Sequence, residues 1–425
     1  MWATRSLGSE SSVAKRAIHA GVERLSESIL AGGGAPLEIV LPDGSRVGFG
    51  EPARTKVIVR DDAALAQLAS PTLASLAEEY VEGRIDVQGD FLEALPLAAR
   101  LAELAGASAL QRVAVLLGGH SVRQDRKDVS YHYDVGNDFY RLWLDQRMVY
   151  SCAYFQAGSE SIDEAQLAKL DHICRKLRLA AGDRFLDVGC GWGGLVLHAA
   201  LHYGVRAVGI TLSKSQFELA RELVQQHGLT DRVEILLLDY RELRDRFGAD
   251  AFDKVASIGM FEHVGIKNLN TYFGSIAAVL RDRGMFLNHG ITSGDLENCP
   301  VGSGIGDFIE KYVFPHGELP HLHVAAREMS AAFEVIDVES LRPHYAKTLE
   351  HWSRRLDARQ EEAARVVSDK TLRIWRAYLA GSAYGFAQGW MSIYQILGSR
   401  HTRPGPSGVP ATREYMYPSR NREFA

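Results

Sequence analysis

Residues 185–195, FLDVGCGWGGL, constrain the fold of this chain more than any other stretch. An apolar run, interrupted by Asp187, passes into glycines at 189, 191, 193 and 194, and a helix-like segment follows over 195–203. Glycine allows a tight turn and a close approach of the backbone to a ligand. The stretch therefore predicts a buried strand that turns sharply into a helix.

A second strand and helix follow at the spacing of a βαβ unit. The apolar residues 207–210, AVGI, lead through Thr211 to a helical pattern that begins at Ser213 and stops at Gly228. Serine commonly caps the start of a helix, and glycine commonly ends one.

A glycine-rich turn between strand and helix is shared by dinucleotide sites and S-adenosylmethionine sites, and it can also be purely structural. In a dinucleotide fold an acidic residue that binds the ribose is expected where this chain has Thr211. Together with Asp187 inside the glycine strand, this favours S-adenosylmethionine. The other two interpretations stay open on this stretch alone.

Composition limits the classes of protein that the chain can belong to. Its 425 residues allow two or three domains, and a hydrophobic share of 46% is typical of a soluble globular protein. The net charge of −5 gives no reason to expect nucleic acid, although local contact with anionic lipid stays open. The cysteines form no CxxC pair, and neither a transmembrane run nor a signal peptide is evident. We expect a cytoplasmic protein without a metal site.

The chain before residue 131 predicts a small α+β domain over 1–120 and a linker over 121–130. A hairpin is expected around the turn Pro42–Ser45, then a strand at 57–59 and helices within 61–80 and 91–117. Glycines followed by a polar run predict the linker.

Residues 131–425 are predicted to form the catalytic domain. A helix at 163–179, strands at 233–238, 252–258 and 285–289, and a helix at 268–282 alternate with the βαβ unit. This alternation predicts a doubly wound parallel sheet. The C-terminal third, 302–398, is expected to be mostly helical and to cover the cleft. The aromatic stretch 131–155 predicts either a pocket lining or core packing.

The carboxyl ends of parallel strands meet at one edge of a sheet, where ligands bind in open α/β folds. This topology predicts that residues spread over a hundred positions of the sequence share one cleft. They are Gly189, Gly191, Thr211, Asp239, Tyr240, Ile258, Glu262, His289 and Ile291.

At this point the sequence resembles the cyclopropane-fatty-acyl-phospholipid synthases and their mycolic acid cyclopropane synthase relatives. The resemblance covers about 125–400 and rests on HYDVGNDFY (132–140), YSCAYF (150–155), LDVGCGWGG (186–194), TLSKSQ (211–216), MFEHVG (260–265), PHYAKTL (343–349) and GxAxxF (381–386). The first 120 residues look like the lipid-handling domain of the bacterial phospholipid enzymes.

The resemblance implies a doubly wound, Rossmann-like methyltransferase sheet with helical cover. It implies transfer of a methylene from S-adenosylmethionine to the cis double bond of a membrane phospholipid acyl chain, with peripheral contact at the inner membrane face and a homodimer. The implied cofactor residues are Tyr150, Ser151, Gly189, Gly191, Thr211, Leu212, Gln216, Asp239, Tyr240 and Ile258. It also implies a bicarbonate ion held by the side chains of Glu262, His289 and Tyr345 and by the amides of Cys152 and Ile291.

Three alternatives remain at this stage. A relative with the same machinery could form methyl- or methylene-branched acyl chains, and some plant alkaloid N-methyltransferases share the YSC and FEH motifs. A lipid-binding protein with a vestigial cofactor site is the non-enzyme alternative. Cys152 is not expected to act as a nucleophile because the chemistry needs no covalent intermediate. The histidines at 316, 321 and 323 lack a carboxylate or cysteine at ligand spacing, so no metal is expected.

Overall fold

The computed structural model describes residues 20–24, 26–27, 29–50, 52–68, 71–106, 135–296, 304–315, 317–406 and 408–418. It divides into two compact units. The small unit takes in 1–123, 300–313 and 352–384, and the large unit takes in 124–299, 314–351 and 385–425. The predicted linker 121–130 lies outside the described residues. The prediction had assigned 300–313 and 352–384 to the catalytic domain, whereas here they group with the N-terminal residues.

A four-stranded sheet in the order β2-β1-β3-β4 forms the centre of the small unit. The predicted hairpin is present, with Ile39 of β1 opposite Val47 of β2. The strands are β1 Leu37–Val40, β2 Arg46–Gly48, β3 Thr55–Val59 and β4 Ile85–Gln88. The last of these was not predicted. The helices are α2 Asp62–Gln67, α3 Leu73–Val81, α4 Phe91–Gly106, α12 Ile305–Tyr312 and α15 Gln360–Val366.

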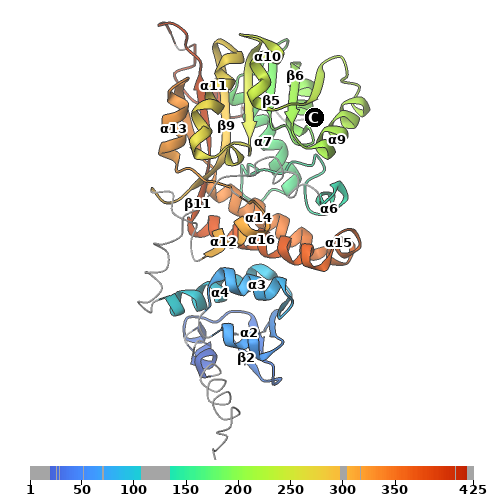
Figure 1. Cartoon of the computed structure of the whole chain (residues 1–425), viewed down its shortest axis with the longest axis vertical. Coiled ribbons are helices and arrows are strands. Elements are labelled where there is room, and N and C mark those ends of the chain that lie inside the picture. The colour runs from blue at the N-terminus through green and yellow to red at the C-terminus, as the bar shows by residue number, and fades with distance from the viewer. Residues whose placement is uncertain are drawn as a thin grey trace, which may run out of the picture. The chain divides into compact units, whose positions relative to one another are not determined.

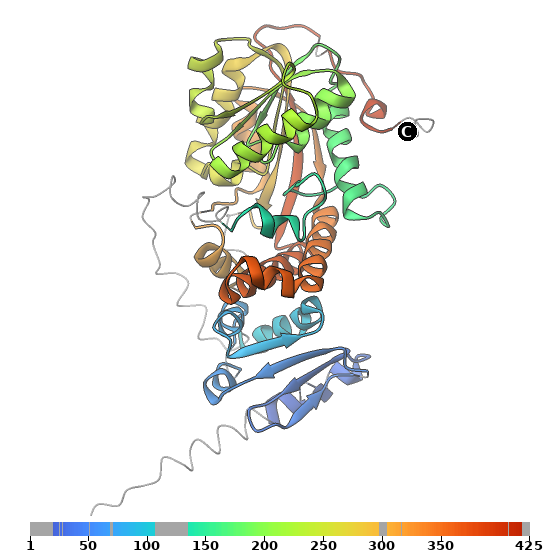
Figure 2. The same ribbon diagram turned by 90° about the vertical axis from the view of Figure 1, so that its right-hand side faces the viewer.

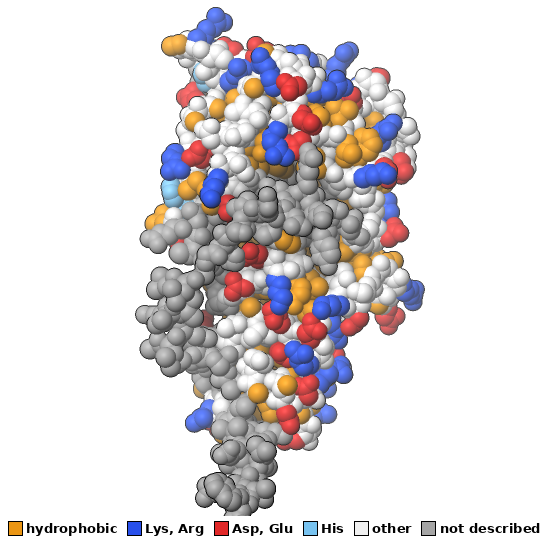
Figure 3. All heavy atoms as spheres, in the orientation of Figure 1, with side chains coloured by type: hydrophobic (Ala, Val, Ile, Leu, Met, Phe, Trp, Pro, Cys, Tyr) orange, Lys and Arg blue, Asp and Glu red, His pale blue; other side chains and the backbone are white. Residues whose placement is uncertain are grey.

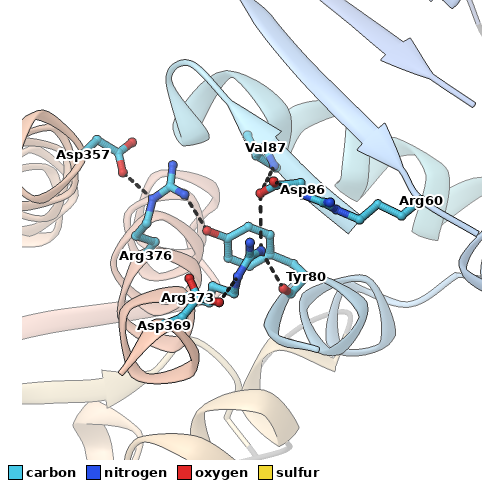
Figure 4. Close-up of polar contacts among 8 residues, drawn as sticks. All are labelled: Arg60, Tyr80, Asp86, Val87, Asp357, Asp369, Arg373 and Arg376. Carbon is cyan, nitrogen blue, oxygen red and sulfur yellow. Dashed lines mark hydrogen bonds and ion pairs between the residues drawn. The ribbon is translucent and has the colours of Figure 1, made fainter. Parts of the chain in front are cut away.

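Buried and part-buried polar contacts tie segment 352–384 of the small unit to its N-terminal segment (Figure 4). Arg376 lies on α16 (Asp369–Gln388) and donates from Nη1 to the hydroxyl of Tyr80 on α3 at 2.6 Å. Its Nε donates to Asp357, at the end of α14 (Arg342–Ala358), at 2.7 Å. Arg373 donates to Asp86 of β4 at 3.3 Å. Helix α16 is therefore part of this unit's core.

The large unit contains a seven-stranded sheet in the order β10-β11-β9-β8-β5-β6-β7. Only β11 runs antiparallel to its neighbours. The strands are β5 Arg184–Val188, β6 Arg206–Thr211, β7 Val233–Leu237, β8 Phe252–Ile258, β9 Leu280–Ser293, β10 Glu334–Ser340 and β11 Met391–Ser399. Strand β5 lies between β6 and β8, so the strand order reverses there, as in doubly wound folds. The predicted fold class is confirmed.

Helices pack on both faces of this sheet (Figures 1 and 2). One apolar cluster includes residues of α7 (Ile162–Lys176), α8 (Gly194–Tyr203) and α9 (Lys214–Gln226). The other includes residues of α10 (Leu243–Phe247), α11 (Leu269–Val279) and α13 (Leu322–Ser330). Shorter helices are α6 Asn137–Arg141, η3 Tyr240–Glu242, η4 Phe261–His263, η5 Ile266–Asn268 and η7 Glu414–Met416.

The helix cap and the glycine turn that were predicted for the βαβ unit are both present. The side chain of Ser213 caps α9 by accepting from the amide of Gln216. The backbone after β5 takes left-handed angles, with φ of 81° at Gly189 and 55° at Gly191. A side chain at these angles is strained, so the turn requires glycine.

The segment 302–398 is mostly helical, as predicted, but it also contains β10 and all of β11 except Ser399, and these two strands extend the sheet. Their short apolar runs do not reveal by periodicity whether they are buried strands or helix segments. Gly389, with φ of 80°, follows α16 and separates it from β11. Strand β9 likewise begins at Leu280, five residues before the predicted strand.

No helix among the described residues is long and apolar enough to cross a bilayer. On the face shown in Figure 3, basic and acidic side chains are interspersed over the surface.

Candidate active site

One cavity of about 210 Å³ opens at the carboxyl ends of β5, β6 and β8 in the large unit. All ten residues predicted to bind the cofactor line it: Tyr150, Ser151, Gly189, Gly191, Thr211, Leu212, Gln216, Asp239, Tyr240 and Ile258. None of the five predicted catalytic residues does. The fold therefore brings the predicted cofactor residues together around one cavity, whereas the predicted catalytic residues lie outside its lining.

Helix α7 holds the segment that carries Tyr150 and Ser151. The side-chain amide of Gln166 donates to the carbonyls of Val149, at 3.2 Å, and Ser151, at 2.8 Å. Lys169, one turn further along α7, donates from Nζ to the hydroxyl oxygen of Ser151 at 2.8 Å. Gln166 and Lys169 are both buried, so this part of the cavity wall is fixed from behind.

Asp187, at the end of β5, also lines the cavity and is buried. Burial raises the pKa of its carboxyl to about 7, and the charge of Lys169 acts in the opposite direction. Its Oδ1 has no hydrogen-bond partner among the described residues. Asp187 was not among the residues predicted to form the site.

The side chain of Thr211, which lies where dinucleotide folds carry an acid, is neutral. Thr211 donates from its hydroxyl to Oε1 of Gln216 at 2.9 Å, which leaves the amide hydrogens of Gln216 available as donors. Asp239 is engaged by Arg241, which donates from Nη2 at 2.7 Å and from Nε at 2.9 Å.

The aromatic stretch supports both earlier interpretations. Phe139, Tyr140 and Trp143 are fully buried and pack as a core, with the rings of Tyr140 and Trp143 5.4 Å apart. Tyr150 contacts this core, with its ring 5.6 Å from that of Tyr140, and also lines the cavity. His132 and Asp134, which had suggested a pocket, lie outside the described residues.

Glu262, on η4 directly after β8, is buried beside β9. Its Oε1 accepts a hydrogen bond from the backbone amide of Ile291 at 2.7 Å, and its Oε2 is buried without a partner among the described residues. Burial raises the pKa of Glu262 to about 7, although the Ile291 amide favours the ionised form. The amide that was expected to bind an anion directly thus holds the carboxylate instead.

His289 lies on β9, two residues before Ile291. Its Nδ1 accepts from the side-chain amide of Gln395 at 3.3 Å, so the imidazole proton is on Nε2. Nε2 is buried and has no partner within the described chain. Burial lowers the pKa of His289 well below its usual value, which keeps the ring neutral.

Backbone contacts link β9 to the other two predicted catalytic residues. Ile291 is paired with Ile393 of β11, whose carbonyl accepts from the amide of Leu341 at 2.9 Å. The Leu341 carbonyl in turn accepts from the amide of Tyr345 at 3.0 Å and contacts the thiol of Cys152 at 3.8 Å. The Cys152 thiol is fully buried, and burial raises its pKa, so it is a poor nucleophile. The ring of Tyr345 packs on Phe386 at 4.6 Å.

The donor and acceptor set beside β9 fits a small protic anion. Bicarbonate carries one O–H group and further acceptor oxygens. Glu262 offers a buried acceptor at Oε2, and His289 offers a buried donor at Nε2. Because unpaired polar atoms are costly to bury, a group that satisfies both would be stabilised here.

Lys169, His263 and Asn268 also line the cavity and were not singled out from the sequence. Lys169 and Gln166 lie three residues apart on one face of α7, but nothing in the local sequence marks this face as buried. The residues that the structure describes contain no group of histidines, cysteines and acids that could hold a metal. His321 and His323 contact each other, and His316 and Cys299 lie outside the described residues.

Comparison with known proteins agrees with this geometry. The family described as mycolic acid cyclopropane synthetase matches residues 120–396. A probable fatty acid methyltransferase of Pseudomonas putida is 47% identical over 90% of this chain and 96% of its own length. The cyclopropane-fatty-acyl-phospholipid synthase of Escherichia coli K12 is 39% identical over 64% of this chain and 68% of its own.

A solved structure supports the same relationship. The mycolic acid cyclopropane synthase CmaA1, solved in complex with S-adenosylhomocysteine and CTAB, is 35% identical, covers 66% of this chain and 99% of its own, and superposes with a TM-score of 0.60. With the cavity and the sheet described above, these matches show that the chain belongs to the mycolic acid cyclopropane synthetase family of S-adenosylmethionine-dependent transferases.

Proposed function

We propose that this enzyme transfers a methylene group from S-adenosylmethionine to the cis double bond of an unsaturated phospholipid acyl chain and forms a cyclopropane ring. The observation that carries the proposal is Glu262, a buried acid with one oxygen held by the Ile291 amide and the other without a partner. It lies beside β9, and its neighbours Met260 and His263 line the cofactor cavity.

The reaction has two steps that the site must serve. The alkene attacks the methyl group of the sulfonium, the carbon–sulfur bond breaks, and a cation is left on the second alkene carbon. An alkene is a weak nucleophile, so alignment with the methyl group matters, and positioning can contribute about 7–11 kcal/mol to lowering such barriers. The buried aromatic core behind Tyr150 would keep water away from that side of the cavity, where water would otherwise capture the cation.

The cation then loses a proton from the new methyl group, and the electron pair of that C–H bond closes the ring. Bicarbonate, when bound, would supply the oxygen base for this proton. Glu262 would accept a hydrogen bond at Oε2, and His289 would donate one from Nε2. Tyr345 and the Cys152 amide would complete the set.

A membrane phospholipid is the proposed lipid substrate, reached by peripheral contact of a cytoplasmic homodimer with the inner membrane face. The support is the E. coli relative, whose name states that product class. The small unit is proposed to handle the lipid, by its resemblance to the N-terminal domain of such enzymes.

Acyl-chain methylation without ring closure is the second candidate. It is favoured by the P. putida relative, which is named a probable fatty acid methyltransferase and matches 90% of this chain. The same cation would then lose a proton from the neighbouring chain carbon and give a branched alkene. The two outcomes thus differ only in which C–H bond is broken.

Expression in a host without cyclopropane lipids tests the proposal. Both products add one CH2 to the acyl chain, so mass spectrometry must be combined with ozonolysis, which cleaves a branched alkene but not a ring. A CH2-enriched, ozone-resistant phospholipid acyl chain is expected. Ozone-sensitive products alone would establish the branching reaction, and an unchanged lipid profile with active, cofactor-binding protein would exclude phospholipid as the substrate.

A further inference from the structure

His289 and Gln395 form a buried polar pair on two neighbouring strands of the large unit. They are directly opposite each other in the register of β9 and β11, so their side chains lie on the same face of the sheet. His289 is 1% exposed and Gln395 is 0% exposed. The side-chain amide of Gln395 donates from Nε2 to Nδ1 of His289 at 3.3 Å. The histidine therefore has a fixed neighbour on one side of its ring.

Gln395 is costly to bury at this place, because its amide is only partly satisfied. Its Nε2 is bonded to His289, whereas its Oε1 is buried without a hydrogen-bond partner among the described residues. An apolar side chain of similar size, such as methionine, would avoid the cost of burying that oxygen. The contact with His289 is therefore what distinguishes glutamine from an apolar residue at this position.

The amide also decides which ring nitrogen of His289 carries the proton. A neutral imidazole has one donor and one acceptor nitrogen, and the bond made by one fixes the role of the other. Since the amide nitrogen of Gln395 can only donate, Nδ1 must be the acceptor. Nε2 then carries the proton, and it is buried without a partner in the described chain. Burial, together with the charges of Lys169 and Lys176, lowers the pKa of His289 and keeps the ring neutral.

A carboxylate in place of the amide would reverse the arrangement, because an ionised acid only accepts hydrogen bonds. The next strand already carries an acid at this level, since Glu339 of β10 is directly opposite Gln395. Burial raises the pKa of Glu339, but its contacts with His172, at 2.7 Å, and Lys176, at 2.5 Å, outweigh this effect and lower the pKa to about 2. Like charges directly opposite each other destabilise a sheet, so a neutral donor suits position 395.

We infer that Gln395 is a positioning residue, which keeps the proton of the neutral His289 ring on Nε2 and so makes that atom a donor. The inference rests on the proposed function, in which Nε2 of His289 would donate to bicarbonate. Gln395 acts through His289, and it does not line the cofactor cavity. Its role is to select the one neutral form of the ring that can donate from Nε2.

The position of the ring proton tests the inference without any reaction. Nitrogen-15 NMR of the full chain, labelled at its 15 histidines, measures which ring nitrogen is protonated, and His289→Asn identifies the signals of His289. Wild type should carry the proton on Nε2 alone. In Gln395→Met no donor holds Nδ1 as the acceptor, so part of the population should carry the proton on Nδ1. A proton on Nδ1 in wild type, or the same distribution in both proteins, would overturn the inference.

The response to bicarbonate is the functional readout. With enzyme prepared free of carbon dioxide, Gln395→Met should need about three- to tenfold more bicarbonate for half-maximal stimulation, the fold-change that corresponds to one net hydrogen bond. The rate at saturating bicarbonate and the affinity for S-adenosylhomocysteine should both stay within about twofold of wild type, a split that general loss of structure would not produce.

Leu397→Met is the matched control. Leu397 is fully buried two residues further along β11, so it lies on the same face of the sheet as Gln395, and it is paired with Leu287 rather than with His289. The substitution changes the packing of the strand but leaves the polar pair in place, and the bicarbonate response should equal that of wild type. A wild-type response in Gln395→Met, or an equal loss in Leu397→Met, would overturn the inference.

The two measurements separate this inference from the proposed function. If Gln395→Met does not fold, wild type decides by itself, because a proton on Nδ1 would leave no acceptor for the amide of Gln395. Wild type with the proton on Nε2 but without any response to bicarbonate would contradict the proposed anion site, while the proton position would still support the role of Gln395.

Discussion

The backbone amide of Ile291 donates a 2.7 Å hydrogen bond to Oε1 of Glu262, across the space between the end of β8 and strand β9. This contact fixes the carboxylate while leaving Oε2 buried and unpaired. It is thus the Glu262 side chain, and not a bound anion, that takes up the Ile291 amide. Oε2 is accordingly the oxygen that would accept the hydrogen bond of the bicarbonate in the proposed proton transfer.

Glu262→Gln should lower turnover by at least about tenfold, the low end for loss of a group that assists proton transfer. Affinity for S-adenosylhomocysteine should stay nearly unchanged, because Glu262 does not line the cavity. Product formation from unsaturated phospholipid vesicles and calorimetry measure the two quantities. Glu218→Gln, an exposed change on α9, serves as the control. Wild-type turnover in Glu262→Gln would remove this residue from the mechanism.

The stability of the protein should report the burial of Glu262. Its folded pKa, about 7, is above the ordinary value of 4.5, so the folded state binds the extra proton between these two pH values. Stability contributed by the protonated acid is present below pH 4.5 and is lost as the pH rises toward 7. Relative to wild type, Glu262→Gln should therefore gain stability between pH 5 and 8, by up to about 3 kcal/mol. Urea unfolding at both pH values measures this, and a constant difference would argue against the raised pKa.

Because Gly290 has no side chain, there is room beside β9 for Phe261 and Glu262. A Cβ at this position would overlap the ring of Phe261 and lie 3.2 Å from Oε1 of Glu262. Gly290→Ala should destabilise the fold by about 1–3 kcal/mol, as overpacking does, and should lower turnover by displacing the carboxylate. Gly274→Ala on α11 is the matched control, since its Cβ would meet nothing within 4 Å. Thermal unfolding and product formation decide, and equal effects of the two substitutions would exclude a positioning role for Gly290.

Much of this site could be read from the sequence because its residues lie at strand ends. Thr211, Asp239 and Ile258 follow or end parallel strands, and topology alone brings such positions together. Lys169 was not predicted to belong to the site, because it lies in the middle of a helix, where a lysine side chain is usually exposed to solvent. Its importance comes from tertiary burial, which no local pattern in α7 reveals.

In the fold, too, the features set by neighbouring residues could be predicted, whereas those that depend on contacts between distant residues could not. The ends of α9 could be predicted from two residues alone, because serine caps the start of a helix and glycine ends one, as Ser213 and Gly228 do here. Strand β10 joins the edge of the sheet by pairing with β11, and the paired residues lie between 54 (Ser340 and Tyr394) and 65 (Glu334 and Ser399) positions apart in the sequence. Assignment of α16 to the small unit likewise depends on Arg376 meeting Tyr80, a contact that spans 296 positions.

Tyr345→Phe should reduce the response to bicarbonate. If the tyrosine hydroxyl helps to hold the anion, adding bicarbonate to enzyme prepared free of carbon dioxide should stimulate wild type more than the variant. Tyr312→Phe, on α12 of the small unit, should respond as wild type does. Product formation across a bicarbonate titration is the measurement, and equal stimulation of wild type and Tyr345→Phe would contradict the anion site.

Arg376→Met tests how the small unit is held together. It would leave the part-buried carboxylate of Asp357 without its charged partner and remove the donor to Tyr80 (Figure 4). Loss of one member of a buried ion pair typically costs about 3–5 kcal/mol. Burial already raises the pKa of Asp357, so in the variant this acid is expected to become neutral, which limits the loss to the lower end of that range. Denaturant unfolding of the full chain measures the effect.

Lys370→Met on the same helix removes an exposed ion pair with Glu82 and should cost less than about 1 kcal/mol. Removing both buried partners, as Arg376→Met with Asp357→Leu, should recover part of the stability that Arg376→Met loses, because no uncompensated charge is then left inside. If Arg376→Met proved no more destabilising than Lys370→Met, the contacts of α16 with α3 would not be what holds segment 352–384 to the N-terminal segment of the small unit. That result would agree better with the prediction from the sequence, in which residues 1–120 form a small α+β domain by themselves.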